Sequence, residues 1–455
     1  MDKSFESFPF TTKLQYRSSL KKVSIINLFS KKKNISIPMK TFGTSMSPFF
    51  SDGDIVYLKR INPAQLMVND FITFKEKSVL ITHRIIYKSQ KSLADKYFFI
   101  TKGDNNLIAD KRIYPTSILG KVEKVNRNKW EIKVDNLYLI QSTYYFSEIV
   151  KFIKNMDRQK IKYVLLKGLP LHLYFENSHP KRLYADCDIL VNKNDFARIQ
   201  LFFQKEGYTT DDPSFSSSEK LIGPKVKECS FFKYKNGMKV EFDIHFEPVF
   251  LPVRIASTNW LYPQSLMEAF HNKLMSEIKV ISIDGESFRI LTKTNLIIYL
   301  SLHLFHHNYH GYYRYELLNN ILKTRKVNYD LIAKDILDYK LQNFVYPVFL
   351  FLSKYYKSPI PKKLLKKIKP EEKTLRLIKE NVLNIKIFDE ELRVQAGTDR
   401  FKYSFYLSPN PFYIKVFIFL TSNVIYSVYF VLLKRTQLFY FRYNFFLKQN
   451  FRKFF

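Results

Sequence analysis

The run Gly43-Thr44-Ser45-Met46-Ser47-Pro48 is the most informative part of this 455-residue chain. Glycine occurs only 11 times, so Gly43 indicates a backbone turn that a larger residue would hinder. The turn leaves the backbone N–H of Ser45 as a natural donor to an oxyanion. A serine hydroxyl becomes a useful nucleophile at neutral pH only when a base accepts its proton and a carboxylate orients that base.

The histidine and the carboxylates that such a serine needs follow downstream. Thr82-His83-Arg84 lies inside an apolar run, and Lys102-Gly103-Asp104-Asn105-Asn106 precedes Asp110. Taken singly these residues are ordinary. A serine, a histidine and an aspartate that each lie in a recognisable local motif, all in one region, together indicate catalysis. The turn residues between short apolar runs predict a small, mostly antiparallel β-domain, with strands at residues 55–58, 71–74, 80–86 and 97–101.

These elements resemble the signal peptidase I superfamily, which also contains the LexA-like self-cleaving repressors. The resemblance covers about residues 36–126, where Ser45-Met46-x-Pro48 matches the nucleophile box and residues 118–122 match the closing strand. Residues 82–84 match the version with histidine in place of the usual bacterial lysine, which is typical of the endoplasmic reticulum and SipW-like enzymes. Residues 101–106, with the aspartate that follows them, match the box of the third triad member.

By this resemblance, Ser45 is the nucleophile, His83 is the base and Asp110 is the orienting acid. Asp104 is a supporting polar residue of the same site, and the peptidase needs no cofactor. Gly43 stands where many relatives place a serine that helps to form the oxyanion hole. The resemblance therefore implies an oxyanion hole built from backbone alone.

Beyond residue 128 the pattern changes to helices and strands in alternation. Helical periodicity begins at residues 147–158. Tyr163 to Lys167 predicts a buried strand that enters a turn at Gly168 and continues into a helix at residues 169–175.

Paired carboxylates follow this unit. Asp186 and Asp188 alternate with Cys187, so a strand would point both carboxylates to one face. Two carboxylates among apolar residues are costly unless a cation joins them, and hard oxygen ligands suit Mg²⁺. Asp243 can join the pair if its strand, residues 239–245, lies beside the first.

This arrangement resembles the nucleotidyltransferase superfamily over about residues 140–355, in a poorly characterised branch with a Lys-Gly box. It implies that a nucleoside triphosphate is aligned for in-line attack by two Mg²⁺ ions. Gly168 would let the backbone approach the phosphates, while Lys167 and Arg182 would balance their charge. The implied Mg²⁺ ligands are Asp186, Asp188 and Asp243.

A run of histidines follows on a predicted helix, at positions 303, 306, 307 and 310. Their spacing places several of them on one face, as in a metal site. Because no acidic ligand is evident beside them, we favour a helix-packing cluster near the nucleotide site. Arg314 and Glu316 could face the substrate, and residues 328–369 predict an amphipathic helix.

The formal net charge of +33 indicates a diffuse basic surface that attracts phosphates or anionic lipid. The sequence lacks a helix-turn-helix, zinc-finger or RNA-recognition signature, so specific nucleic-acid binding is not predicted. Two cysteines without zinc spacing indicate a reducing compartment. Residues 1–33 have no apolar core of signal-peptide length, which favours a cytoplasmic protein.

The apolar segment Val416 to Leu433 leaves three interpretations open. A buried helix of a helical domain is favoured, since Thr421-Ser422-Asn423 interrupts the run. Peripheral membrane contact through this C-terminal segment is the second interpretation, and a spanning helix is the third.

We therefore predict an α+β multidomain chain with a β-rich peptidase domain, an α/β nucleotidyltransferase-like domain and a helical C-terminal extension. After an N-terminal extension at residues 1–35, these occupy residues 36–126, 140–355 and 356–455. The predicted partners are a peptide or protein substrate and a nucleoside triphosphate, with both halves acting on one peptide. Three alternatives stay open: a LexA-like self-cleaving regulator, a signal peptidase held at a membrane, and a scaffold of two degenerate enzyme folds.

Overall fold

The computed structural model describes residues 36–47, 49–89, 97–106, 108–127, 130–176, 184, 186–210, 227–235, 238–248, 251, 261–324, 327–389 and 402–416. The chain divides into two compact units. Unit 1 comprises residues 1–144, 179–183 and 387–390, and unit 2 comprises the remainder. The predicted α+β multidomain fold is confirmed.

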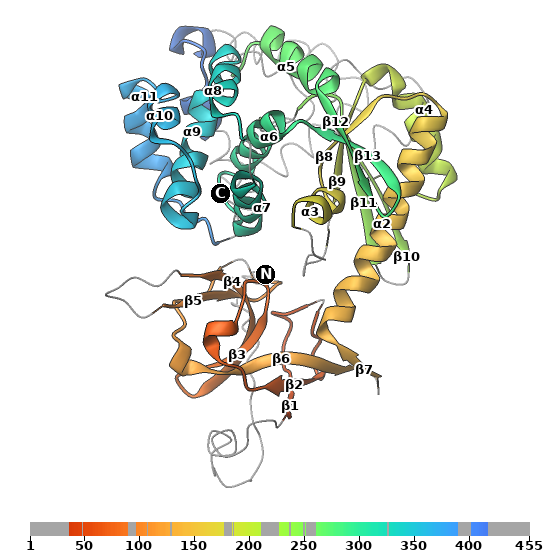
Figure 1. The fold of residues 1–455 in the computed structure, drawn as a ribbon, viewed down its shortest axis with the longest axis vertical. Helices are drawn as coiled ribbons and strands as arrows, with labels where there is room; N and C mark the ends of the chain where they lie inside the picture. Colours follow the sequence, from red (N-terminus) through yellow and green to blue (C-terminus); the bar gives the residue numbers. More distant parts are fainter. Residues whose placement is uncertain are drawn as a thin grey trace, which may run out of the picture. The chain divides into compact units, whose positions relative to one another are not determined.

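Unit 1 is built on one antiparallel sheet with the order β1-β2-β6-β3-β4-β5, and β7 pairs with β6 (Figure 1). Side chains alternate between its faces, so Phe71 joins one apolar cluster and Ile72 the other. The strands are β1 (Ser36–Lys40), β2 (Ile55–Lys59), β3 (Phe71–Glu76), β4 (Val79–Lys88), β5 (Phe99–Lys102), β6 (Ile118–Arg127) and β7 (Trp130–Lys133).

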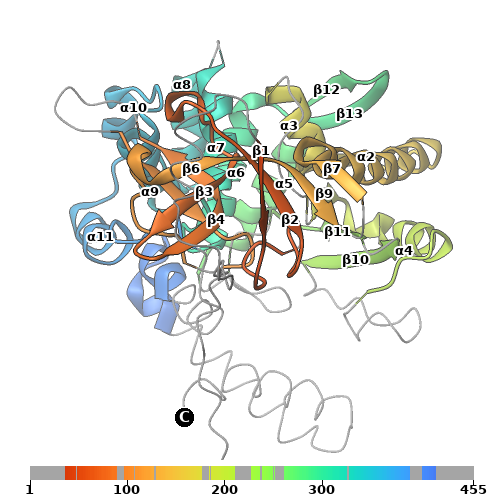
Figure 2. The same ribbon diagram turned by 90° about the horizontal axis from the view of Figure 1, so that it is seen from below.

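Unit 2 contains a mixed sheet with the order β10-β11-β9-β8-β13-β12. Figure 2 shows the pair at each end of this order, β10 with β11 and β12 with β13. Two neighbouring pairs, β9 with β11 and β8 with β13, are parallel, whereas β8 and β9 are antiparallel. The strands are β8 (Tyr163–Lys167), β9 (Cys187–Val191), β10 (Glu228–Lys235), β11 (Met238–His245), β12 (Ile278–Ile283) and β13 (Glu286–Leu291).

Helices flank this sheet and dominate the chain after it. The helix predicted at residues 147–158 begins earlier, at Val134. The helices are α2 (Val134–Arg158), α3 (Leu169–Glu176), α4 (Phe196–Lys205), α5 (Gln264–Ser276), α6 (Lys293–His306), α7 (Tyr312–Lys323), α8 (Tyr329–Asp338), α9 (Gln342–Phe351), α10 (Lys362–Lys367) and α11 (Glu372–Leu377).

The prediction of one amphipathic helix over residues 328–369 is wrong, because this stretch forms several short helices. Lys340 and Lys357 take positive φ angles of 51° and 52°, which end α8 and the turn after α9. Such angles interrupt a right-handed helix. Among the described residues, none of the helices combines the length and the apolar character needed to cross a bilayer. Most of the segment 416–433 lies outside the described residues.

Candidate functional site

Ser45 lies in a turn between β1 and β2. Gly43 has a φ angle of 90° and donates its N–H to Asp52 Oδ1 at 2.7 Å, so the turn needs a glycine there. The carbonyl oxygen of Ser45 accepts a hydrogen bond from the backbone N–H of Asn105 at 2.8 Å. A Cβ atom on Gly103 would lie 2.7 Å from that carbonyl oxygen. The loop after β5 therefore packs directly on the turn that carries the serine.

The structure brings Ser45, His83 and Asp110 together in the predicted order. Ser45 Oγ lies 3.0 Å from His83 Nε2, and His83 Nδ1 lies 2.5 Å from Asp110 Oδ2. Thr101 Oγ1 donates to the same Asp110 oxygen at 2.7 Å, which fixes the carboxylate. A carboxylate on Nδ1 holds the proton there and leaves Nε2 to accept one from the serine. The contacts form a serine–histidine–aspartate hydrogen-bond relay.

Asp104, the other carboxylate predicted for this site, binds Arg84 instead of His83. Arg84 donates from Nε to Asp104 Oδ1 at 2.6 Å and from Nη2 to Asp104 Oδ2 at 2.5 Å. The guanidinium also donates to Tyr138 Oη at 2.6 Å and lies over the rings of Phe49 and Phe71. Alternation along β4 places Arg84 on the face opposite His83. Asp104 therefore supports the loop that carries Asp110 and lies outside the relay.

Replacing Arg84 by methionine is expected to lower the free energy of unfolding by about 3–5 kcal/mol, because Asp104 would stay largely buried without a counter-charge. Urea denaturation measures this loss. Lys59→Met is the matched control, since it breaks an exposed ion pair with Glu123 and should cost less than about 1 kcal/mol. Equal losses in the two variants would contradict the structural role of Arg84.

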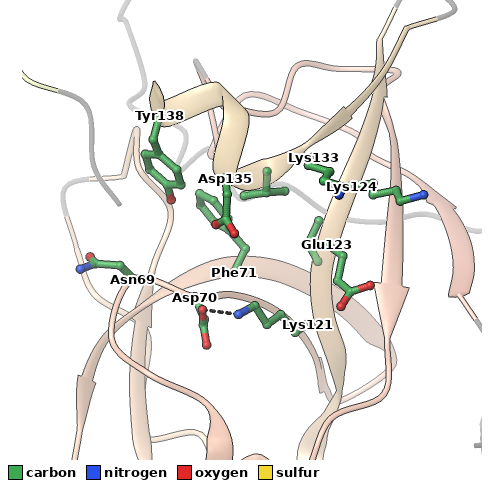
Figure 3. Close-up of a pocket in the computed structure, with 11 residues that line it drawn as sticks. Asn69, Asp70, Phe71, Lys121, Glu123, Lys124, Lys133, Asp135 and Tyr138 are labelled. Carbon is green, nitrogen blue, oxygen red and sulfur yellow. Dashed lines mark ion pairs between the residues drawn. The ribbon is translucent and has the colours of Figure 1, made fainter. Parts of the chain in front are cut away.

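Unit 1 also holds a cavity of about 300 Å³ between β3, β6 and the start of α2 (Figure 3). An ion pair between Asp70 and Lys121, 2.6 Å long, lies on its wall. Phe71 and Tyr138 line it as well, and both also contact Arg84. Its described lining does not include the relay residues, so it is separate from the catalytic candidate.

In unit 2 the three predicted carboxylates converge. Asp243 of β11 lies in register with Asp188 of β9, and Asp186 directly precedes that strand. One oxygen from each carboxylate lies within 4.8 Å of the others. Carboxylate oxygens on opposite sides of one Mg²⁺ ion are about 4.2 Å apart, so a small closing movement would suffice. The residues present thus fit a divalent cation of the predicted kind.

The electrostatics of these carboxylates point the same way. Burial, followed by the charges of Asp188 and Asp186, raises the pKa of Asp243 to about 7. Asp188 Oδ1 lies 2.9 Å from His245 Nε2. Burial lowers the pKa of His245, but the hydrogen bond to Asp188 and the charges of Glu228, Asp188 and Asp243 together outweigh burial, so the pKa is raised. The acidic group therefore attracts protons and cations.

The predicted Lys-Gly box lies against this acidic group. Lys167 Nζ contacts Asp186 Oδ2 at 2.9 Å and Asp188 Oδ2 at 3.0 Å. Gly168 has a φ angle of 125°, and a Cβ atom there would lie 3.2 Å from Cys187 Sγ. The absence of a side chain on Gly168 therefore allows the end of β8 to pack closely on β9. Arg182 lies outside the described residues.

The rings of His303 and His306, at the end of α6, and of His307, directly after it, lie close to one another. The ring centroids of His303 and His307 are 4.7 Å apart, and those of His303 and His306 are 6.3 Å apart. Burial, followed by the charge of Lys167, lowers the pKa of His303, and burial and Arg314 lower that of His307. The imidazoles of His303 and His307 therefore lose a proton more readily than a free histidine does, and the favoured packing cluster stays a prediction.

Comparison with known proteins separates the chain into the same two parts. The family described as "Uncharacterised nucleotidyltransferase" matches residues 127–357. Signal peptidase complex catalytic subunit SEC11C of Homo sapiens is 31% identical over 124 residues, which cover 27% of this chain and 58% of that protein. Signal peptidase complex catalytic subunit SEC11 of Clavispora lusitaniae is 39% identical over 72 residues, covering 15% and 42% respectively.

The chain spans about half the length of the curated relatives it matches. No solved structure matches it. The curated relatives show that the first part resembles signal peptidases. The family match shows that the second part is nucleotidyltransferase-like. The chain belongs to the uncharacterised nucleotidyltransferase family and joins it to a signal-peptidase-like region.

Proposed function

We propose that the signal-peptidase-like part is a serine endopeptidase. The observation that carries this proposal is the relay of Ser45 Oγ to His83 Nε2 at 3.0 Å and His83 Nδ1 to Asp110 at 2.5 Å. The named relatives are catalytic subunits of signal peptidase complexes, so a peptide or protein is the expected substrate.

The relay suits acyl transfer. Ser45 Oγ would attack the scissile carbonyl carbon while His83 Nε2 takes the hydroxyl proton and Asp110 stabilises the imidazolium. The backbone N–H of Ser45 would donate to the oxyanion. The C–N bond then breaks, and His83 returns the proton to the leaving amine. Water, activated by His83, hydrolyses the ester and regenerates the serine.

A second activity, Mg²⁺-dependent nucleotidyl transfer, is favoured by the convergence of Asp186, Asp188 and Asp243. These carboxylates would hold Mg²⁺, which when bound neutralises phosphate charge and favours in-line transfer. Lys167 would pair with the triphosphate, and the turn at Gly168 would allow its close approach to the strand end.

Mass spectrometry tests both activities on the full chain. Incubation with a peptide library reports cleavage, and incubation with Mg²⁺ and each nucleoside triphosphate reports mass added to a peptide. A self-cleaving regulator would instead lose mass when incubated alone. A scaffold would leave every peptide unchanged.

One peptide acted on by both halves is the simplest account of the fusion. Knocking out either half in the host is expected to change the mass of the same small peptide. If each knockout left every small peptide unchanged, the shared substrate would be ruled out, whereas the separate activities would still be open to the assays above.

Mg²⁺ affinity is expected to fall as the pH drops below about 7, because the Asp243 carboxyl must lose its proton to become a ligand. Calorimetric titration at about pH 6 and about pH 8, in buffers with different ionisation enthalpies, measures both affinity and proton release. Glu241→Gln, on the same strand and outside the convergent group, should keep the pH dependence. An affinity independent of pH would contradict the role of Asp243.

A further inference from the structure

The ammonium group of Lys167 lies among the carboxylates that the proposed metal site would use. Its contacts with Asp186 Oδ2 and Asp188 Oδ2 are 2.9 and 3.0 Å long. The Lys167 side chain is 15% exposed and that of Asp188 only 4%. Two of the three convergent carboxylates thus already have a cation at contact distance.

The backbone of β8 fixes this position. Lys167 ends the strand opposite Asp188 in the antiparallel register, after a local irregularity next to Leu165. The next residue, Gly168, packs against Cys187 so closely that a side chain would crowd its sulfur. The stem of Lys167 therefore starts beside the acidic group, and its ammonium reaches both aspartates.

We propose that Lys167 is a built-in counter-ion, which occupies the cation position of this site until a metal–nucleotide complex arrives and then exchanges the carboxylates for phosphate oxygens. The inference rests on the proposed nucleotidyltransferase function. A bare divalent cation would have to displace the ammonium without offering it a new partner, since two cations at such short range repel. A metal–triphosphate complex supplies that partner. The site should therefore discriminate against free metal.

Arg314 provides a second cation near the same place. Its helix, α7, packs against α3, the helix that follows Gly168. Burial lowers the pKa of Lys167, and the positive charge of Arg314 is close enough to lower it as well. The charges of Asp186 and Asp188 outweigh both effects, so the pKa of Lys167 is raised. Among the described residues Arg314 has no carboxylate partner and lies 4.5 Å from the Tyr313 ring centroid. A triphosphate could thus pair with both Lys167 and Arg314.

Calorimetric titration of the full chain with MnCl₂ and with preformed Mn²⁺–ATP tests the exchange. Lys167→Met and the closer isostere Lys167→Gln remove the internal cation. Both variants are expected to bind free Mn²⁺ about tenfold more tightly than wild type and Mn²⁺–ATP more weakly. Lys205→Met, at an exposed position on α4, is the matched control and should bind both like wild type.

One outcome would overturn the counter-ion role while keeping the metal site. Wild type and both Lys167 variants would bind free Mn²⁺ with equal affinity, and Asp186→Asn/Asp188→Asn would not bind it. Weaker binding of free Mn²⁺ by the Lys167 variants would also overturn the counter-ion role. If neither free Mn²⁺ nor Mn²⁺–ATP bound to any form, the proposed nucleotidyltransferase site itself would fail. Circular dichroism of each variant confirms that the comparison is between folded proteins.

Discussion

Replacing Ser45 by alanine is expected to lower kcat/KM for peptide cleavage by at least about 10⁴-fold. The variant lacks the oxygen that lies 3.0 Å from His83 Nε2 and would attack the scissile carbonyl. His83→Ala should cause a similar loss, and the double variant should be no worse, because the two residues act as one unit. Mass-spectrometric quantification of cleaved peptide measures all three.

The neighbouring Ser47 supplies a matched control for this test. It lies in the same turn, where its N–H bonds to the carbonyl of Thr44 at 3.0 Å, and it takes no part in the relay. Ser47→Ala should cleave at the wild-type rate. Cleavage that survived in Ser45→Ala but not in Ser47→Ala would identify a different nucleophile. Losses that added up in the double variant would contradict a shared relay.

The second large effect is expected in unit 2. Mg²⁺ with a bound nucleoside triphosphate at about 100 times its dissociation constant should stabilise wild type by about 2.7 kcal/mol. Asp186→Asn/Asp188→Asn should lose this stabilisation and the transfer reaction, since two of the three convergent carboxylates disappear. Thermal unfolding with each triphosphate, with and without Mg²⁺, measures the effect.

Glu241→Gln controls for loss of negative charge on β11. Glu241 pairs with Lys239 at 2.7 Å and is not part of the convergent group. It should retain the full Mg²⁺–nucleotide shift. A shift that persisted in the double aspartate variant would place nucleotide binding elsewhere in the chain. Absence of any shift in wild type would leave the peptidase as the enzymatic candidate.

Local patterns along the chain were enough to predict most of the residues that converge in the two candidate sites. Ser45 and His83 each lie in a short motif, and the neighbouring residues predict the turn or strand that carries it. The pairing of Asp243 with Asp188 needed one more assumption, that two buried strands are neighbours. The parallel register of β9 and β11 confirms that assumption.

Other features depend on contacts between segments that are distant in the sequence, so local patterns could not predict them. Arg84 meets Asp104 and Tyr138 only after β4, a loop and α2 have packed together. Lys167 can reach Asp186 and Asp188 only because β8 and β9 pair with a local irregularity. The early start of α2 was missed because its first turns are stabilised by packing within unit 1, where Val134 and Tyr138 are buried.

Helix α2 also determines how the protein can be divided. Val134 and Tyr138 belong to a core cluster with Met46 and Phe71, whereas Tyr145, on the same helix, donates to the carbonyl of Glu241. Cutting the chain at residue 127, where the family match starts, would remove Val134 and Tyr138 from the core of the signal-peptidase-like part. Those two sets of contacts fall on either side of the division between Tyr144 and Tyr145, so a fragment boundary belongs inside the helix rather than at its start.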